Sequence, residues 1–260
     1  MKFYHFGEKI APVIFLFPGT CCHWRANFEE VIPLLEQDFQ VVCVSYDGFD
    51  ETEKTIFPDM LQETKKIEMY IKKKFGGHIY AAYGCSLGGS FVGLLVQRKK
   101  VHIDHGILGS SDLDQGGGIS ARFQAWLVSK MLYGMFQKGK LPGIMEKKLK
   151  NKPKEDFVYY DKMLTMFGMK DTRMSFVRQK SIRNQFYYDL VTSLEDEIFV
   201  TGTTIHCFYA AKMGEKYLAR YQKHFKNPDI HCHDMQHEEL LICYPKEWVK
   251  EIRKCCGIEK

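Results

Sequence analysis

The chain has 260 residues, of which 45% are hydrophobic, 27% charged and 14% aromatic, a composition that excludes a disordered protein and suits one large globular domain. The net charge of +5 is unevenly spread, because residues 115–183 contain 15 Lys and Arg against 5 Asp and Glu, whereas the remainder contains 22 against 27. Nine cysteines, an odd number, argue against a disulfide framework and for free thiols in a reducing cytoplasm. The apolar run at 13–17 is too short to span a membrane, so we expect a cytoplasmic protein without integral membrane association.

Strand and helix patterns alternate through most of the chain. Continuous apolar runs predict buried strands, and apolar residues at helical spacing predict helices. The predicted strands are 11–17, 39–50, 78–84, 102–112, 203–211 and 228–235, and the predicted helices are 25–37, 60–77, 87–100, 213–225 and 245–256. This alternation indicates an α/β fold with a mostly parallel, doubly wound sheet.

Residues 115–194 interrupt the alternation. They contain helical stretches rich in Met and aromatic residues, separated by a lysine-rich run, and begin near three consecutive glycines that suggest a hinge. We therefore expect an α/β core formed by 1–114 and 195–260, with 115–194 inserted as a basic helical cap. The apolar side chains of this cap have two interpretations: they form its own core, or they line an acyl or aromatic pocket above the active site.

The stretch Gly84-Cys85-Ser86-Leu87-Gly88-Gly89 follows one predicted strand and precedes a helix. A GxSxG pattern is weak evidence alone, but this context is what a nucleophile on a sharp strand-to-helix turn requires. Small neighbours permit the strained turn, and the helix N-terminus favours a developing negative charge. Ser86 is therefore the predicted nucleophile, whereas Cys85 should point into the core and be inert.

With "FPGT" after an early strand, "DG" after the next and a late "QHEE", the chain resembles the α/β-hydrolase superfamily, in particular cytoplasmic serine esterases of bacterial type. The resemblance covers nearly all of the chain outside the predicted cap. It implies an oxyanion hole formed by the backbone N–H of Leu87 and a second N–H from the "PGT" loop, which maps best onto Thr20, or else onto Cys21.

The resemblance also places the catalytic histidine after the last strand. His231 and His233 lie within or at the end of that predicted strand, where histidine is usually structural, whereas His237 lies in the following turn and is the predicted general base. Together with Cys232, these three histidines could also suggest a metal site. Because no second pair of ligands stands at zinc spacing elsewhere, we expect no metal and no cofactor.

The acid of the triad is left open between two positions. Glu215 lies just beyond the point where the family usually places it, which Met213 occupies here, and Asp112 or Asp114 follows the strand before the cap. Each carboxylate also has an ordinary structural explanation, as a first-turn helix residue or a cap. A serine–histidine pair without a strong acid partner is the third alternative.

These features predict a serine hydrolase that cleaves a carboxylic ester or thioester through an acyl-enzyme on Ser86. The alternatives are acyl transfer or peptide cleavage by the same pair, and a non-catalytic hydrolase-fold binding protein with a degenerate acid. The expected partner is a small-molecule substrate, and the basic cap also suits an anionic or acyl-carrier-linked one. No nucleic-acid partner is expected, because the lysines occur without a recognised binding motif.

Overall fold

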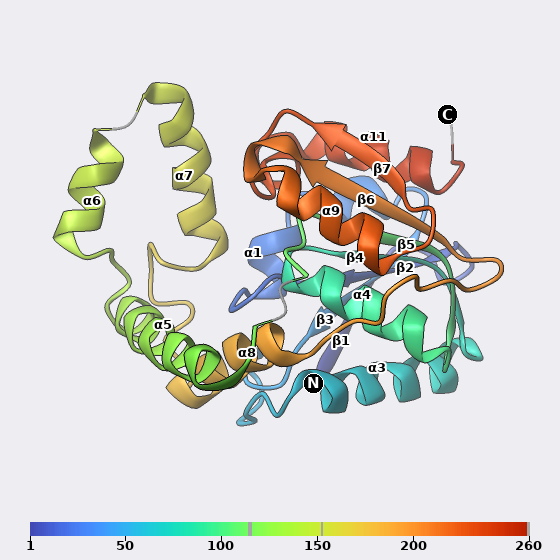
Figure 1. The fold of residues 1–260 in the computed structure, drawn as a ribbon, viewed down its shortest axis with the longest axis horizontal. Helices are drawn as coiled ribbons and strands as arrows, with labels where there is room; N and C mark the ends of the chain where they lie inside the picture. Colours follow the sequence, from blue (N-terminus) through green and yellow to red (C-terminus); the bar gives the residue numbers. More distant parts are fainter. Residues whose placement is uncertain (114–115, 152, 259–260) are drawn as a thin grey trace.

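A seven-stranded sheet forms the centre of the molecule (Figure 1). The computed structural model describes residues 1–113, 116–151 and 153–258 of the chain. The strand order is β1-β3-β2-β4-β5-β6-β7, and β1 alone among them pairs antiparallel with its neighbour. The strands are β1 (Lys2–Phe6), β2 (Val13–Phe17), β3 (Gln40–Ser45), β4 (His78–Gly84), β5 (His102–Leu108), β6 (Thr204–Ala210) and β7 (Asp229–His233).

Helices cover both faces of the sheet. One face is packed by α3 (Met60–Phe75), α4 (Leu87–Arg98) and α9 (Glu215–His224), with the 3-10 turn η1 (Ala211–Met213) leading into α9. The other face is packed by α1 (Trp24–Phe28), α2 (Ile32–Leu35), α10 (Glu239–Cys243) and α11 (Pro245–Cys255). The predicted doubly wound α/β fold is therefore confirmed.

The apolar run of β2 shows why the sheet can be covered on both sides. Successive side chains of a strand point to opposite faces. Phe15 and Phe17 accordingly pack under α3 and α4, whereas Ile14 and Leu16 pack under α1 and α11, and all four are fully buried. A continuous apolar run is the pattern that this double burial requires.

Two local expectations were wrong. Strand β1 was not predicted, because it lies at the edge of the sheet and its residues are only partly buried, so its hydrophobic signal is weak. The helix expected at 25–37 is divided into α1 and α2, with Pro33 in the first turn of α2. Proline lacks the N–H that a continuous helix would use and favours a helix start.

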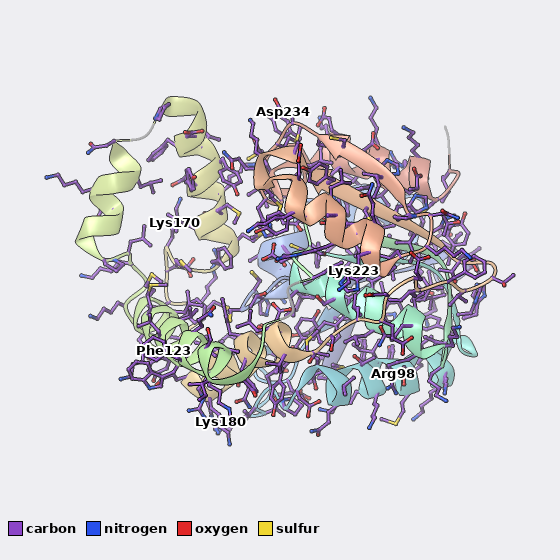
Figure 2. The ribbon with its side chains drawn as sticks, in the orientation of Figure 1. Arg98, Phe123, Lys170, Lys180, Lys223 and Asp234 are labelled. Atoms are coloured by element: carbon purple, nitrogen blue, oxygen red, sulfur yellow. The ribbon has the colours of Figure 1, made fainter. Side chains whose placement is uncertain are left out.

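The segment between β5 and β6 forms the helices α5 (Gly118–Lys138), α6 (Gly143–Lys150), α7 (Lys154–Met166) and α8 (Gln179–Val191), and we call residues 116–194 the helical insertion. Helices α5, α6 and α7 lie to one side of the sheet (Figure 1). Helix α8 packs against α5, and α7 contacts α1 and α10 of the core directly. Helix α6 falls in the lysine-rich run that the sequence suggested only as a separator. Exposed apolar side chains, Phe123 among them, extend from α5 (Figure 2).

Candidate active site

Ser86 occupies the turn between β4 and α4, with backbone angles φ 50° and ψ −114°. A residue with a Cβ is strained at such angles, so its neighbours must be small. A Cβ on Gly84 would lie 2.0 Å from the carbonyl carbon of Gly88, and one on Gly88 would lie 2.2 Å from the carbonyl oxygen of Phe17. The Ser86 hydroxyl does not cap α4 and is only partly buried, so it is free to meet a substrate.

The two N–H groups predicted to hold an oxyanion lie on either side of this turn. Leu87 is the first residue of α4, and Thr20 lies in the loop after β2, the strand hydrogen-bonded to β4. A Cβ on Gly19 would lie 3.6 Å from the Cβ of Ser86, which places this loop against the turn. Among the hydrogen bonds of the described residues, none uses the N–H of Leu87 or of Thr20. Both donors are therefore available to a ligand.

The alternative donor, Cys21, is already occupied. Its backbone N–H donates to Oε1 of Gln185 over 2.6 Å, and the N–H of Gly19 donates to Asn27 over 2.8 Å. Backbone groups that are paired within the protein cannot also stabilise a developing charge. The geometry thus favours Thr20 over Cys21 as the second donor.

His237 lies in the loop between β7 and α10. Burial lowers the pKa of its imidazole, and the neighbouring Glu238 carboxylate acts in the opposite direction. A lowered pKa keeps the ring neutral near neutral pH, which is the form that accepts a proton. The hydroxyl of Tyr159, from α7 of the helical insertion, donates to the carbonyl oxygen of His237 over 2.9 Å and so fixes the backbone of this loop.

Glu238 joins the histidine loop to the nucleophile turn, a role that sequence reasoning did not assign. This side chain is 3% exposed, and its Oε1 accepts the backbone N–H groups of Ser86 and Ser110, each over 2.8 Å. Its Oε2 accepts the hydroxyl of Tyr83 over 2.9 Å. A Cβ on Gly109 would lie 2.6 Å from Oε1, so this glycine leaves room for the carboxylate. The "HEE" pattern alone gave no reason to distinguish Glu238 from its neighbour.

Neither proposed acid is hydrogen-bonded to His237, whose imidazole has no such partner within the described residues. Glu215 is exposed at the start of α9. Asp112 follows β5, and its backbone carbonyl accepts a hydrogen bond from Arg220 over 2.8 Å. Asp114 lies outside the described residues. The identity of the acid therefore stays a prediction.

Helix α8 connects the helical insertion to the loops of the site through polar side chains. Besides Gln185, Asp189 accepts the hydroxyl of Thr20 over 3.4 Å, and Asn184 donates to the carbonyl of Phe57 over 2.8 Å. Positions 185 and 189 are one helical turn apart, so both face the same loop. The Nε2 of Gln185 is buried and has no partner among the described residues.

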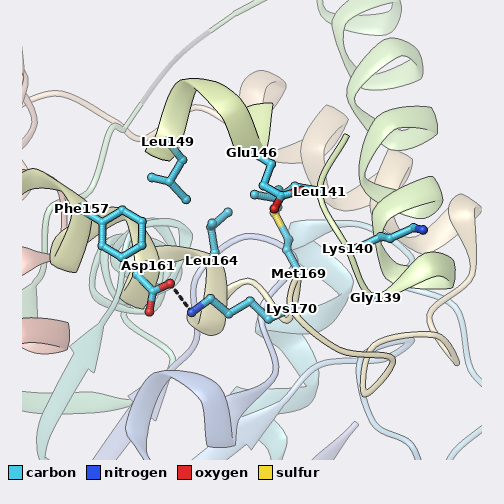
Figure 3. Close-up of a pocket in the computed structure, with 10 residues that line it drawn as sticks. All are labelled: Gly139, Lys140, Leu141, Glu146, Leu149, Phe157, Asp161, Leu164, Met169 and Lys170. Carbon is cyan, nitrogen blue, oxygen red and sulfur yellow. Dashed lines mark ion pairs between the residues drawn. The ribbon is translucent and has the colours of Figure 1, made fainter. Parts of the chain in front are cut away.

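One described cavity of the helical insertion lies away from Ser86. It has a volume of about 410 Å³ and lies between α6, α7 and the segment after α5, with Phe157, Leu164 and Met169 in its wall (Figure 3). Asp161 and Lys170 form an ion pair at its edge. Neither Ser86 nor His237 lines this cavity, and Met169 is the one methionine among the described residues of its wall.

Residues 12–144 match the sequence profile of the alpha/beta hydrolase fold family, and the chain belongs to this family. Cys85, beside the predicted nucleophile Ser86, is fully buried, and burial raises the pKa of its thiol. A search of curated proteins found no match to the sequence.

Within the described residues, no helix combines the length and apolar character that a membrane span requires.

Solved structures show the same fold at low identity. An alpha/beta hydrolase family protein from Desulfitobacterium hafniense has a TM-score of 0.77 and 14% identity, covering 97% of this chain and 99% of that one. A hydrolase from Pseudomonas aeruginosa PA01 has a TM-score of 0.70 and 13% identity, covering 98% and 93%. A carboxylesterase from Nitrososphaera gargenis has a TM-score of 0.70 and 12% identity, covering 99% and 94%. Identities this low show the fold and not the substrate.

Proposed function

We propose that the protein is a serine hydrolase that cleaves a carboxylic ester or thioester through an acyl-enzyme on Ser86. The observation that carries this proposal is the strained turn at Ser86, whose hydroxyl makes no cap hydrogen bond and which adjoins the loop of Thr20, with the N–H groups of Leu87 and Thr20 unused among the described residues. Such donors are worth most where negative charge develops in the transition state. The likeness to a carboxylesterase fold is compatible with this activity.

In the proposed reaction, Ser86 Oγ attacks the carbonyl carbon and its proton passes to His237. The N–H groups of Leu87 and Thr20 hold the oxyanion of the tetrahedral intermediate. His237 then protonates the leaving alkoxide or thiolate, and a water molecule activated by the same imidazole releases the acid. Because neither Glu215 nor Asp112 is bonded to His237, we propose a serine–histidine pair whose geometry depends on Glu238, with these two carboxylates as the acids to test.

Two alternatives use the same fold. Acyl transfer or peptide cleavage would need the same Ser86 and His237, with a different acceptor or scissile bond. A non-catalytic binding protein is favoured by one observation, the absence of a carboxylate hydrogen-bonded to His237 among the described residues. The substrate of the proposed enzyme is a small molecule, and the basic insertion suits one with an anionic group or an acyl carrier.

Labelling with a fluorophosphonate probe tests the proposal, because the probe reacts only with an activated serine. Wild-type protein should be labelled and Ser86→Ala should not. Ser90→Ala, which changes a buried serine one turn further along α4, is the matched control and should be labelled like wild type. Folded wild-type protein that takes up no probe would support the binding alternative, and labelling that survives in Ser86→Ala would exclude Ser86 as the nucleophile.

A further inference from the structure

A second group of chemically active side chains lies between β6, β7 and α11. His206 and His231 are each the third residue of their strand, whereas the Ser86 turn follows the carboxyl end of β4. One possible ligand atom from each of His206, His231 and Cys255 lies within 4.8 Å of the other two. His206 and Cys255 are buried, and His231 is largely so. The proposed hydrolase reaction uses none of these residues.

The parallel pairing of β6 and β7 brings these side chains onto one face of the sheet. His206 is paired with Asp229, and His231 is paired two residues further along β6, so all three side chains point the same way. Helix α11 covers this face, and its residues Glu251 and Cys255 are one turn apart. Three elements distant in sequence therefore present ligands to one point.

The sulfur–nitrogen distance in this group matches that of a tetrahedral zinc site. Zinc–nitrogen bonds of about 2.0–2.1 Å and zinc–sulfur bonds of about 2.3 Å place two nitrogens about 3.3 Å apart, and nitrogen and sulfur about 3.6 Å apart. The Sγ of Cys255 lies 3.6 Å from Nε2 of His231. The Oδ2 of Asp229 lies 3.0 Å from that same nitrogen and 3.0 Å from Nδ1 of His206.

Both imidazoles also have the supporting contacts that metal-binding histidines use. The second nitrogen of His231, Nδ1, lies 3.2 Å from a carboxylate oxygen of Glu251. The second nitrogen of His206, Nε2, lies 3.4 Å from Nδ1 of His105 on β5. Such outer contacts fix the tautomer and orient the ring toward the metal.

We propose that His206, His231, Cys255 and Asp229 bind one Zn²⁺ ion in a four-coordinate structural site that fastens α11 to the edge strand β7. Two nitrogens, one sulfur and one oxygen form a donor set of the borderline kind that zinc accepts. His206, His231 and Cys255 form the observed group, and Asp229, which contacts both imidazoles, would complete a closed four-coordinate site rather than a catalytic one with an open position.

Zinc content measured by mass spectrometry tests this site. Wild-type protein reconstituted with ZnCl₂ and passed through gel filtration should retain one zinc per chain, and Cys255→Ser or His231→Gln should bind at least tenfold more weakly. The matched control is Cys232→Ser, which removes an exposed thiol from the opposite face of β7 and should retain the metal. Equal zinc content in wild type and Cys255→Ser would overturn the proposal.

Cobalt gives a readout that depends on the sulfur itself. Co²⁺-loaded wild type should show tetrahedral d–d bands and a thiolate-to-cobalt charge-transfer band, and Cys255→Ser should lose the latter. The second described group with metal-binding residues, formed by His78, His102 and Asp104, is the competing location. Metal that disappears in His78→Gln and persists in His231→Gln would place the ion there and contradict the proposal.

A further variant avoids any dependence on core folding. Asp229→Asn changes a side chain that is 56% exposed, so the protein should fold. Zinc should raise the Tm of wild type, because a ligand of the folded state stabilises it by mass action, and should raise that of Asp229→Asn less. An equal rise in both would remove Asp229 from the ligand set, and no rise in wild type would overturn the site. Ser86→Ala should bind zinc like wild type, which separates this test from that of the hydrolase.

Discussion

The α/β core and the helical insertion differ in how they treat apolar side chains. In the core, a strand such as β2 has its apolar residues from Ile14 to Phe17 enclosed between two layers of helices. The insertion buries one side of α5 and leaves the other in solvent. The exposed apolar residues of α5 are Ile119, Phe123, Trp126, Leu127 and Met131. A sheet has two faces to cover, and both are covered; a peripheral helix has one face to bury and one face free.

The core and the helical insertion are joined by hydrogen bonds in addition to apolar contacts. Gln185 and Asp189 on α8 contact the loop of Thr20, and Tyr159 on α7 contacts the loop of His237. These are the loops that carry the proposed chemistry. The comparison therefore suggests that the core supplies the reacting groups and that the insertion holds their loops in place.

The strongest test of this division is Ser86→Ala, since it removes a reacting group and leaves both regions intact. We expect kcat/KM for a p-nitrophenyl ester to fall at least about 10³-fold. The free energy of unfolding should stay within about 0.5 kcal/mol of wild type, as for most surface changes. A smaller loss of activity with unchanged stability would show that catalysis does not depend on this core residue.

Two phenylalanines on α5 test the difference in burial directly. Phe136→Ala empties a fully buried position and should lower the free energy of unfolding by about 3–5 kcal/mol. Phe123→Ala changes a side chain that is 61% exposed and should alter it by less than about 0.5 kcal/mol. Chemical denaturation of both variants measures the contrast, and equal losses would show that the outer face of α5 is covered in solution.

Glu238 tests whether the core positions its own histidine. Glu238→Ala leaves two buried N–H groups without their acceptor and should lower the free energy of unfolding by about 1–3 kcal/mol. Activity should fall with it, through kcat rather than KM, because Glu238 acts on Ser86 and His237 and not on the substrate. Glu238→Gln keeps an acceptor for both N–H groups and should restore most of the stability.

The charge of Glu238 should also affect the pH dependence of kcat/KM, separately from its effect on stability. This charge raises the pKa of His237, against the effect of burial, so Glu238→Gln should lower that pKa further. Because the neutral imidazole is the active form, the acidic limb of the kcat/KM profile should move to lower pH. Glu239→Gln is the matched control and should leave the limb in place. An unmoved limb in Glu238→Gln would mean that His237 is not the titrating base.

The smallest effect should come from the hydrogen bonds that join the insertion to the core. Gln185→Ala frees the N–H of Cys21 and should cost about 1 kcal/mol of stability, with a roughly tenfold fall in kcat/KM from a looser Thr20 loop. Lys180→Ala, an exposed change on the same helix, is the control and should behave like wild type (Figure 2). Wild-type kinetics in Gln185→Ala would show that α8 does not support the oxyanion loop.

Much of the fold could be predicted because its signals are local. The apolar run of β2 predicts a strand, and the glycines around Ser86 predict a sharp turn. Each signal lies within a few residues, and both elements are present. Prediction failed where the local sequence signal is weak and a distant part of the chain decides whether an element forms. Strand β1 exists because β3 offers it a hydrogen-bonding edge, which its own sequence does not reveal.

The site divides in the same way. Ser86, Leu87 and Thr20 follow from short motifs, whereas Glu238 acquires its role from Ser110 and Tyr83, which are more than a hundred residues away in sequence. The acid could not be assigned from the sequence because a carboxylate near a strand end is common, and only its distance to an imidazole distinguishes a catalytic one.

The sequence by itself determined the class of fold and the sharp turn that carries Ser86, because strand, turn and helix patterns extend over a few residues each. The tertiary structure alone decided which side chains meet. Sequence spacing suggested a metal group within residues 231–237 and then excluded it, yet the pairing of β6 with β7 and the packing of α11 bring His206 and Cys255 to His231. Contacts of this kind depend on the register between strands and on the face that a helix covers, and neither is encoded in the spacing of a single segment.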